Sequence, residues 1–319
     1  MLTWFEVIGY TVLLEPDIAP GKLQAERYSY TDVVLRDRLQ KALSIINPNI
    51  PLKAIEEAIS KLTCLENLSL EENNYRFHKL LTDGITVSYQ VDDWKIYDKV
   101  QIIDLFNLLN NDWLVVHQFT VIDGNKIHCP GAVIFINGLP LAVIELPNQA
   151  NEKATLNEGS SHFCKYIHCR GERPFAPTIP NLQNWDASLN EAYQQLQIYK
   201  QDIPKLFYYN QLLVISDGTQ ARVGTITSDW EQFMPWLTID GEDFSLLWAD
   251  ELEVLVQGIF DKRRFLDLVK NFILFERNGA TIHKKMADYQ QFYSVRSPLA
   301  HQQHHSHPKE RNMCHMIDD

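Results

Sequence analysis

The chain has 319 residues, of which 45% are hydrophobic and 22% charged, a composition typical of globular proteins. Its net charge of −12 argues against a freestanding protein that binds nucleic acid without sequence preference, because that affinity comes mainly from Lys and Arg. The 5 cysteines have no regular spacing, and no apolar run approaches the ~18 residues of a membrane span. The start of the chain also lacks the pattern of a signal peptide, so we expect a cytoplasmic protein without membrane contact.

The N-terminal third reads mainly as helices. Residues 4–14 predict the end of a helix that passes through Gly9 into a strand. Apolar residues at helical spacing then predict helices over residues 31–46, 52–62 and 70–81. Three strands follow, over residues 85–91, 100–105 and 113–122. Because short turns separate these strands, we expect a largely antiparallel meander flanked by the earlier helices.

Residues 131–147 have the strongest pattern in the sequence. Two apolar, β-branched runs, 132–136 and 141–146, flank Asn137-Gly138, and an Asn-Gly between such runs is a strong signal for a β-hairpin. We expect the hairpin to be buried, with its turn centred on Gly138 and Leu139. This register places residues 131 and 132 beside Glu145 and Leu146 at the open end.

Glu145 is the acidic residue at this open end. Side chains alternate faces along a strand, so residues 145 and 147 point the same way. A carboxylate that ends an apolar strand is costly to bury without a partner, which suggests a function. Hydrolysis of a phosphodiester needs carboxylates to hold Mg²⁺ and a Lys to orient the attacking water. The corresponding positions 131, 145 and 147 hold Gly, Glu and Pro.

Residues 130–148 resemble the nuclease hairpin of the R (restriction) subunit of type I restriction-modification enzymes. That pattern runs Arg-Pro-Asp, two strands around Asn-Gly-x-Pro, and Ile-Glu-Leu-Lys. Here Pro130 and Glu145 are retained, whereas Gly131 replaces the Asp and Pro147 replaces the Lys. The resemblance implies an α/β, restriction-endonuclease-like fold with a mixed sheet, a central hairpin and flanking helices, and it makes Glu145 the expected metal ligand.

The resemblance also implies cofactors and partners. DNA would be the substrate and Mg²⁺ the cofactor of the PD-(D/E)xK site, and the specificity and methylation subunits would be partners. ATP would act only through a motor domain, which is absent from this chain.

A possible insertion follows the hairpin. Residues 154–158 and 187–191 read as the same helix start written twice, each with a capping box. We therefore expect residues 159–186 to be an inserted surface loop and the helix proper to run over 188–200. On this helix, Gln195 and Tyr199 match the Q-x-x-x-Y element of the family. Their spacing of four puts both side chains on one face, where they can bond a phosphate or steady Glu145.

The rest of the chain predicts a second hairpin and then helices. The hairpin uses residues 206–216 and 220–227, and helices are expected over 252–260 and 262–276. Trp230 and Trp236 have the helical spacing of core residues rather than of a base-stacking platform. Residues 284–292 resemble the family's lead-in to its motor domain. We expect a nuclease-like domain over residues 1–240, a helical extension over 241–296, and a disordered or out-of-frame tail over 297–319.

Two alternatives concern metal ions. Asp112 or Asp123 could replace the lost acidic ligand, and Lys153 could replace the lost Lys, but each starts from a different backbone position. A zinc site could combine His162, Cys164, His168 and Cys169 with the nearby His128 and Cys129. The spacing of these residues does not follow the usual zinc motifs, which favours scattered residues in a loop.

The sequence therefore leaves three hypotheses. The first is a degenerate, catalytically impaired copy of the nuclease domain. The second is a non-enzymatic module that binds DNA or assembles with the other subunits. The third is a zinc-binding regulator.

Overall fold

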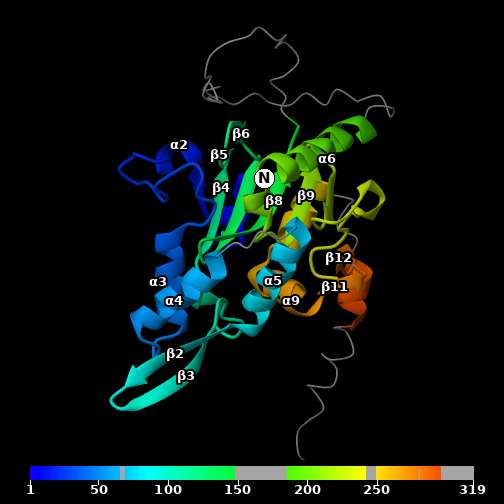
Figure 1. Cartoon of the computed structure of the whole chain (residues 1–319). Coiled ribbons are helices and arrows are strands. Elements are labelled where there is room, and N and C mark those ends of the chain that lie inside the picture. Colours follow the sequence, from blue (N-terminus) through cyan, green and yellow to red (C-terminus); the bar gives the residue numbers. More distant parts are fainter. Residues whose placement is uncertain (65–68, 148–184, 242–248, 280, 296–319) are drawn as a thin grey trace, which may run out of the picture.

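A six-stranded mixed sheet forms the centre of the molecule (Figure 1). The computed structural model describes residues 1–64, 69–147, 185–241, 249–279 and 281–295. The strands lie in the order β1-β4-β7-β8-β9-β10. Their bounds are Thr11–Leu14 (β1), Trp113–His117 (β4), Ala132–Ile136 (β7), Leu139–Glu145 (β8), Leu212–Ser216 (β9) and Ala221–Gly224 (β10).

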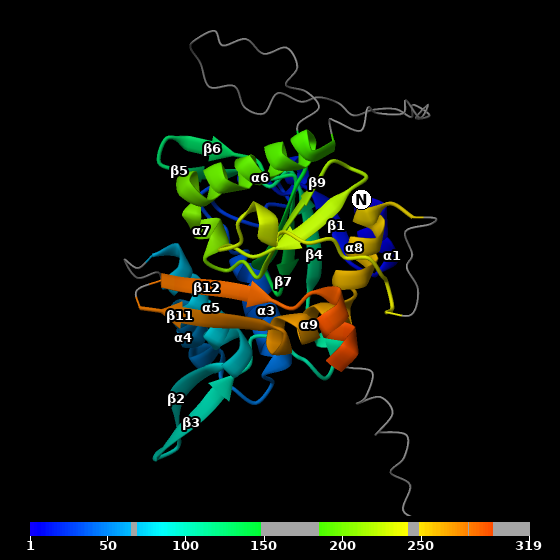
Figure 2. The same ribbon diagram turned by 90° about the vertical axis from the view of Figure 1, so that its right-hand side faces the viewer.

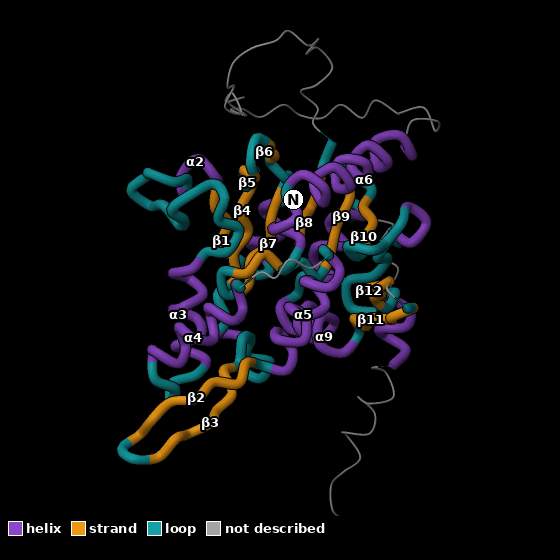
Figure 3. The backbone as a smooth tube through the Cα atoms, in the orientation of Figure 1, coloured by secondary structure: helices purple, strands orange, loops and turns teal. Residues whose placement is uncertain are grey.

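The strand directions explain why the sheet is mixed. Strands β4, β7 and β8 pair antiparallel, as do β9 and β10, whereas β1 joins β4 and β9 joins β8 in parallel. The mixed α/β fold with a central hairpin is thus confirmed. The predicted meander is wrong in part, because strand β2 (Ile85–Val91) pairs outside this sheet with β3 (Trp94–Val100). Figure 3 shows this β2–β3 hairpin projecting away from the body of the molecule.

Helices surround the sheet. Helix α6 lies across β8 and β9, while α1 and α8 pack near β1 and β10 (Figure 2). The helices are α1 (Leu2–Val7), α2 (Glu15–Ile18), α3 (Arg36–Ile46), α4 (Leu52–Thr63), α5 (Leu70–Asp83), α6 (Trp185–Asp202), α7 (Pro204–Phe207), α8 (Glu251–Ile259) and α9 (Lys262–Asn271). Within the described ranges, no helix combines the length and the apolar character needed to cross a bilayer.

The turn of the central hairpin is held from several sides. Asn137 and Gly138 both have positive φ angles, 54° and 76°, as expected for a two-residue hairpin turn. The Asn137 side chain accepts from the Asp112 N–H at 2.7 Å and donates to Ile102 O at 2.9 Å. The Gly138 carbonyl accepts from the Leu35 N–H at 2.9 Å, at the start of α3. The turn is therefore fixed by buried hydrogen bonds as well as by its own sequence.

The register of this hairpin differs from the predicted one. Ile136 pairs with Leu139, so the turn is Asn137-Gly138 and not Gly138-Leu139. A β-bulge next to Phe135 then leaves Leu141 as an extra residue in β8, and Ala132 pairs with Ile144. Because the bulge largely offsets the shifted turn, Gly131 still lies beside Glu145 at the open end.

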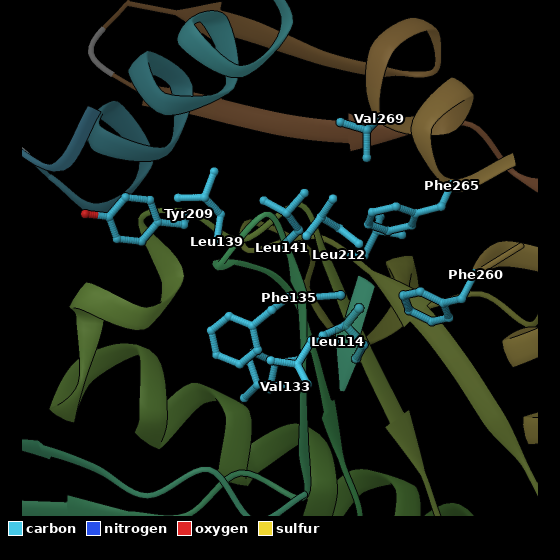
Figure 4. Close-up of a cluster of buried hydrophobic side chains, with 14 of the residues drawn as sticks. Leu114, Val133, Phe135, Leu139, Leu141, Tyr209, Leu212, Phe260, Phe265 and Val269 are labelled. Carbon is cyan, nitrogen blue, oxygen red and sulfur yellow. The ribbon is translucent and has the colours of Figure 1, made fainter. Parts of the chain in front are cut away.

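Both strands of the hairpin are buried along their whole length. Figure 4 shows Phe265 and Val269 of α9 pointing toward Leu141 and Leu212, and Phe135 beside Val133. An apolar strand covered on both sides needs no alternation of polar residues, which explains the continuous apolar runs in the sequence. Burial of these side chains from water is the main favourable contribution to folding here.

Two short hairpins were not predicted. One is β5 (Val121–Asp123) with β6 (Lys126–His128), and it replaces the end of a strand predicted over 113–122. That strand stops at His117 because Gln118 has a positive φ of 59°, which breaks the extended backbone. The other is β11 (Ile273–Asn278) with β12 (Thr281–Met286). It contradicts the helix predicted over 262–276, since α9 ends at Asn271.

Other predicted boundaries also moved. The strand expected over 100–105 is wrong, because β3 ends at Val100, and the Ile102 carbonyl accepts from Asn137 instead of from a neighbouring strand. The strand expected over 206–216 begins only at Leu212, after α7 opens at Pro204. Helix α6 already starts at Trp185, so Ser188 lies inside it and is not its N-cap. The predicted tail over 297–319 lies outside the described residues, as does nearly all of the predicted insertion over 159–186.

A substitution at the turn tests how tightly the hairpin is held. We expect Gly138→Ala to lower the free energy of unfolding by about 2–4 kcal/mol, because a Cβ there would overlap Leu35 O, lie 2.9 Å from Leu39 N and require a positive φ. Urea denaturation measures this loss. Gly124→Ala is the matched control: Gly124 also has a positive φ but no atom within 4 Å of the added Cβ, so about 1 kcal/mol is expected. Equal losses in the two variants would contradict the packing argument.

Candidate functional site

Glu145 is the last residue of β8, and its carboxyl group is enclosed by protein. Only 5% of the residue is exposed. The backbone N–H of Gly131 donates to Oε2 at 3.1 Å, and the hydroxyl of Tyr199 donates to Oε1 at 3.2 Å. The hairpin supplies the acid and the first donor, and α6 supplies the second. The structure therefore brings together three of the residues selected from the sequence.

Burial governs the protonation of this acid. Desolvation raises the pKa of Glu145 to about 8, although the hydrogen bonds from Gly131 and Tyr199 act in the opposite direction. The group is consequently mostly protonated at neutral pH. A neutral carboxylic acid is a weak ligand for a hard cation, which prefers charged oxygen donors.

Tyr199 is positioned by the apolar face of α6. Leu189, Ala192 and Leu196 on the same helix are buried, and Tyr199 follows them at helical spacing. Gln195, one turn earlier, contributes a side-chain hydrogen bond to Tyr199. Burial and the neighbouring Glu145 raise the pKa of Tyr199, so its hydroxyl keeps its proton and remains a donor. Gln195 and Tyr199 thus lie on one helix face beside Glu145.

His128 and Asp202 extend this group, and sequence reasoning did not assign them to it. The His128 ring lies 4.9 Å from the Tyr199 ring, and its Nε2 is 2.8 Å from Asp202 Oδ2. The hydrogen bond with His128 is the largest cause of the lowered pKa of Asp202. The sequence contained a signal for this arrangement, because His128 lies three positions before Gly131 and Asp202 lies three positions after Tyr199. Residues three apart on a helix lie on neighbouring faces.

Gly131 and Pro147 occupy the two positions where the resembling pattern has Asp and Lys. A Cβ added at Gly131 would lie 3.1 Å from Ile144 O, which is tight but does not overlap. Pro147 follows the last residue of β8 by two positions. It therefore lies beyond the strand's hydrogen-bond ladder, where a residue without an N–H is tolerated. Neither residue presents an acidic or basic side chain near Glu145.

The two acidic residues suggested as replacements are each paired with a basic side chain. Asp112 is at the turn end of the hairpin, where both its oxygens bond to Arg38, so the length of the strands separates it from Glu145. Asp123 on β5 pairs with Lys205 at 3.3 Å. Lys153 and the residues of the zinc alternative from 162 to 169 lie outside the described residues.

The residues around Glu145 do not fit a divalent cation. In the part of the chain that the structure describes, no group of three His, Cys, Asp or Glu side chains is placed to hold a metal ion. The carboxyl group itself already accepts two hydrogen bonds from the protein. Because Mg²⁺ dehydrates reluctantly and requires several oxygen ligands, one buried acid is not sufficient.

The raised pKa predicts a specific pH dependence of stability. An acid whose pKa is higher in the folded state loses stability as the pH rises from its ordinary value of 4.5 toward about 8. We expect Glu145→Gln to remove this loss. Over that pH range, the free energy of unfolding of the variant should therefore rise relative to that of the natural chain by up to about 1.4 kcal/mol per pH unit. Urea denaturation of both proteins at pH 5 and pH 8 measures the difference. Parallel stability profiles would contradict the raised pKa.

Comparison with known proteins places this chain in a family. Residues 1–171 and 181–232 match the family model described as type I restriction enzyme R protein N terminus. The chain is 32% identical over 295 residues to the type I restriction enzyme HindI endonuclease subunit of Haemophilus influenzae, covering 90% of this chain and 24% of that protein. It is 25% identical over 311 residues to the MjaIXP endonuclease subunit of Methanocaldococcus jannaschii, a provisionally named type I restriction enzyme, covering 92% of this chain and 26% of that protein.

The chain thus spans about a quarter of the length of these two relatives. The family match covers all six strands of the central sheet, including the Glu145 hairpin, and helix α6. On this evidence, the chain belongs to the family of type I restriction enzyme R protein N-terminal domains.

Proposed function

We propose that this chain is a catalytically silent copy of the DNA-cleaving domain of a type I restriction enzyme R subunit. The observation that carries the proposal is the closed environment of Glu145. Its carboxyl group is 5% exposed and bonded to Gly131 and Tyr199, and the two positions that would complete the chemistry hold Gly131 and Pro147. At these two positions a phosphodiester would meet neither a second acid nor an ammonium group.

The wider assignments follow the same family. DNA and the specificity and methylation subunits are the proposed partners, and Mg²⁺ is the cofactor that an intact site would require. We assign residues 1–240 to the nuclease-like domain, with the insertion over 159–186, and residues 241–296 to an extension of it. Helix α8 in this extension contacts α1 and β10, which supports a close association of the two parts.

A second candidate function is a non-enzymatic module that assembles with protein partners or binds DNA. Large apolar side chains are exposed on the projecting β2–β3 hairpin, with Trp94 79% and Tyr97 68% exposed. Such side chains favour a protein contact. Co-purification with the specificity and methylation subunits, reduced by Trp94→Ala, would support assembly. Salt-dependent retardation of DNA that Trp94→Ala leaves unchanged would support DNA binding instead.

The main proposal predicts an inactive protein. Purified chain incubated with supercoiled plasmid and Mg²⁺ or Mn²⁺ is expected to leave the plasmid without nicks, because positions 131 and 147 provide neither a second acid nor an amine. Agarose gel electrophoresis detects nicking as the conversion of supercoiled to open-circular DNA. Nicking that Glu145→Ala abolishes would refute the proposal.

Restoring the lost groups is a sharper version of the same test. The double variant Gly131→Asp with Pro147→Lys is expected to recover metal-dependent cleavage, since the Cβ at residue 131 requires only a small shift and residue 147 lies outside the ladder. Gly131→Asp alone, and the double variant with Glu145→Ala added, are the matched controls and should remain silent. A double variant that keeps the natural chain's stability but does not cleave would show that the site has lost more than two residues.

A further inference from the structure

Lys284 on β12 is buried, with only 2% of the residue exposed. Its hydrogen-bond partners are not those of Glu145. Its Nζ donates to Asn210 O at 2.8 Å, to Asn74 Oδ1 at 3.0 Å and to Gln211 Oε1 at 3.2 Å. Three acceptors match the three donors of a lysine ammonium group. None of the three is a carboxylate, so the amino group is buried without a charged partner among its acceptors.

The backbone of Lys284 is held as well. Its carbonyl accepts from the hydroxyls of Thr225 at 2.7 Å and Thr227 at 2.9 Å, and its N–H donates to Thr227 Oγ1 at 2.8 Å. Gln211 is anchored to the central sheet, because its N–H donates to Leu141 O of β8. One residue of the β11–β12 hairpin therefore bonds to α5, to the segment that enters β9 and to the segment that follows β10.

The pKa values of this cluster reflect its burial. Desolvation lowers the pKa of Lys284 well below its ordinary value. His78 on α5 shares Gln211, with Nδ1 2.8 Å from Gln211 Oε1. Burial, followed by the nearby Lys284, lowers the pKa of His78 to about 4. Both bases therefore bind protons more weakly when the hairpin is docked than when they are exposed to water.

The other charged groups on these elements are more exposed. On α5, Asp83 and Lys79 act on His78 in opposite directions. Between α5 and β11, Glu72 pairs with Arg277 at 2.9 Å. Within the hairpin, Lys285 pairs with Glu276 and lowers the pKa of that carboxyl group, and His283 is exposed. The segments that enter β9 and follow β10 contribute only neutral groups, Asn210, Gln211, Thr225 and Thr227, to the hydrogen bonds with Lys284.

We propose that Lys284 is a releasable anchor that docks the β11–β12 hairpin onto the domain, and that mild acid undocks this hairpin while the central sheet stays folded. The hairpin pairs only with itself and shares no strand ladder with the sheet. It is therefore attached through side-chain contacts and the hydrogen bonds of Lys284. This inference goes beyond the proposed function and does not rest on it.

The sign of the pH effect follows from linkage. His78 binds its proton at about pH 4 when docked and at about 6.5 when exposed, so the undocked state takes up an extra proton between these values. The docking equilibrium constant should fall by up to about tenfold per pH unit below 6.5. The Glu276–Lys285 pair lies within the hairpin and is retained when the hairpin undocks, so it does not alter the sign of the pH effect.

Hydrogen exchange of the full chain, followed by mass spectrometry, tests the anchor. In Lys284→Met, amides of Ile273–Asn278 and Thr281–Met286 should exchange at least tenfold faster at pH 7.5, because the three hydrogen bonds from Lys284 Nζ to buried oxygens are lost. Amides of Ala132–Ile136 should be unchanged. Lys285→Met is the matched control, since it removes the exposed neighbouring lysine, and it should leave hairpin exchange within about twofold of the natural chain.

The natural chain provides a second measurement that needs no substitution. After correction for intrinsic rates, lowering the pH from 7.5 to 5.5 should accelerate exchange in the β11–β12 hairpin selectively, and His78→Gln should weaken this acceleration. Equal exchange in Lys284→Met and Lys285→Met would overturn the proposal. So would acceleration that spreads equally to the central sheet, because it would mean that Lys284 supports the whole fold and not a separable hairpin.

Discussion

The register of one buried hairpin, β7–β8, is the constraint on which the rest of the structure depends. Both strands are buried along their length, so a shift of one residue would turn apolar side chains toward different neighbours. Asn137 fixes this register at the turn through bonds to Asp112 N–H and Ile102 O. The same register places Gly131 beside Glu145 at the other end. The position of the candidate site is thus determined by the core and not by its own polar groups.

The proposed loss of catalytic activity is compatible with an intact fold. Gly131 does not require a positive φ and lies at the edge of β7, and Pro147 lies past the last paired residue of β8. Neither position supports the core, so neither replacement disturbs it. Gly131 and Tyr199 each donate a hydrogen bond to one of the two carboxyl oxygens of Glu145. The proposed loss of activity would therefore leave a small, closed hydrogen-bond cluster at this edge of the sheet.

Sequence patterns predicted the elements in which burial and periodicity agree. The central hairpin, α3 to α5 and the Gln195–Tyr199 face of α6 all combine a clear period with apolar residues. The bulge at Leu141 was not predicted, because a bulge changes pairing without changing the apolar pattern. β3 was missed because its exposed residues, Trp94 among them, do not form an apolar face. The β11–β12 hairpin was missed although Asn278-Gly279 carries the same turn signal as Asn137-Gly138.

The site was predicted less completely than the fold. Glu145 and Tyr199 were selected through their resemblance to a known pattern, and they do meet. The approach of His128 and Asp202 depends on where β6 and the end of α6 lie in space, which local spacing cannot specify. The same limit applies to Lys284, whose partners Asn74 and Asn210 are 210 and 74 residues away along the chain.

The parallel pairing of β8 with β9 also has a consequence for synthesis on the ribosome. Strand β8 ends at Glu145, but its neighbour β9 begins only at Leu212, so residues 146–211 are made before that edge can be covered. During this interval β8, which is buried along its whole length in the folded protein, presents unpaired backbone groups, which is the condition that promotes intermolecular strand association. A chaperone that holds the emerging polypeptide would shield this edge until its partner arrives, and slower translation would lengthen the period of risk.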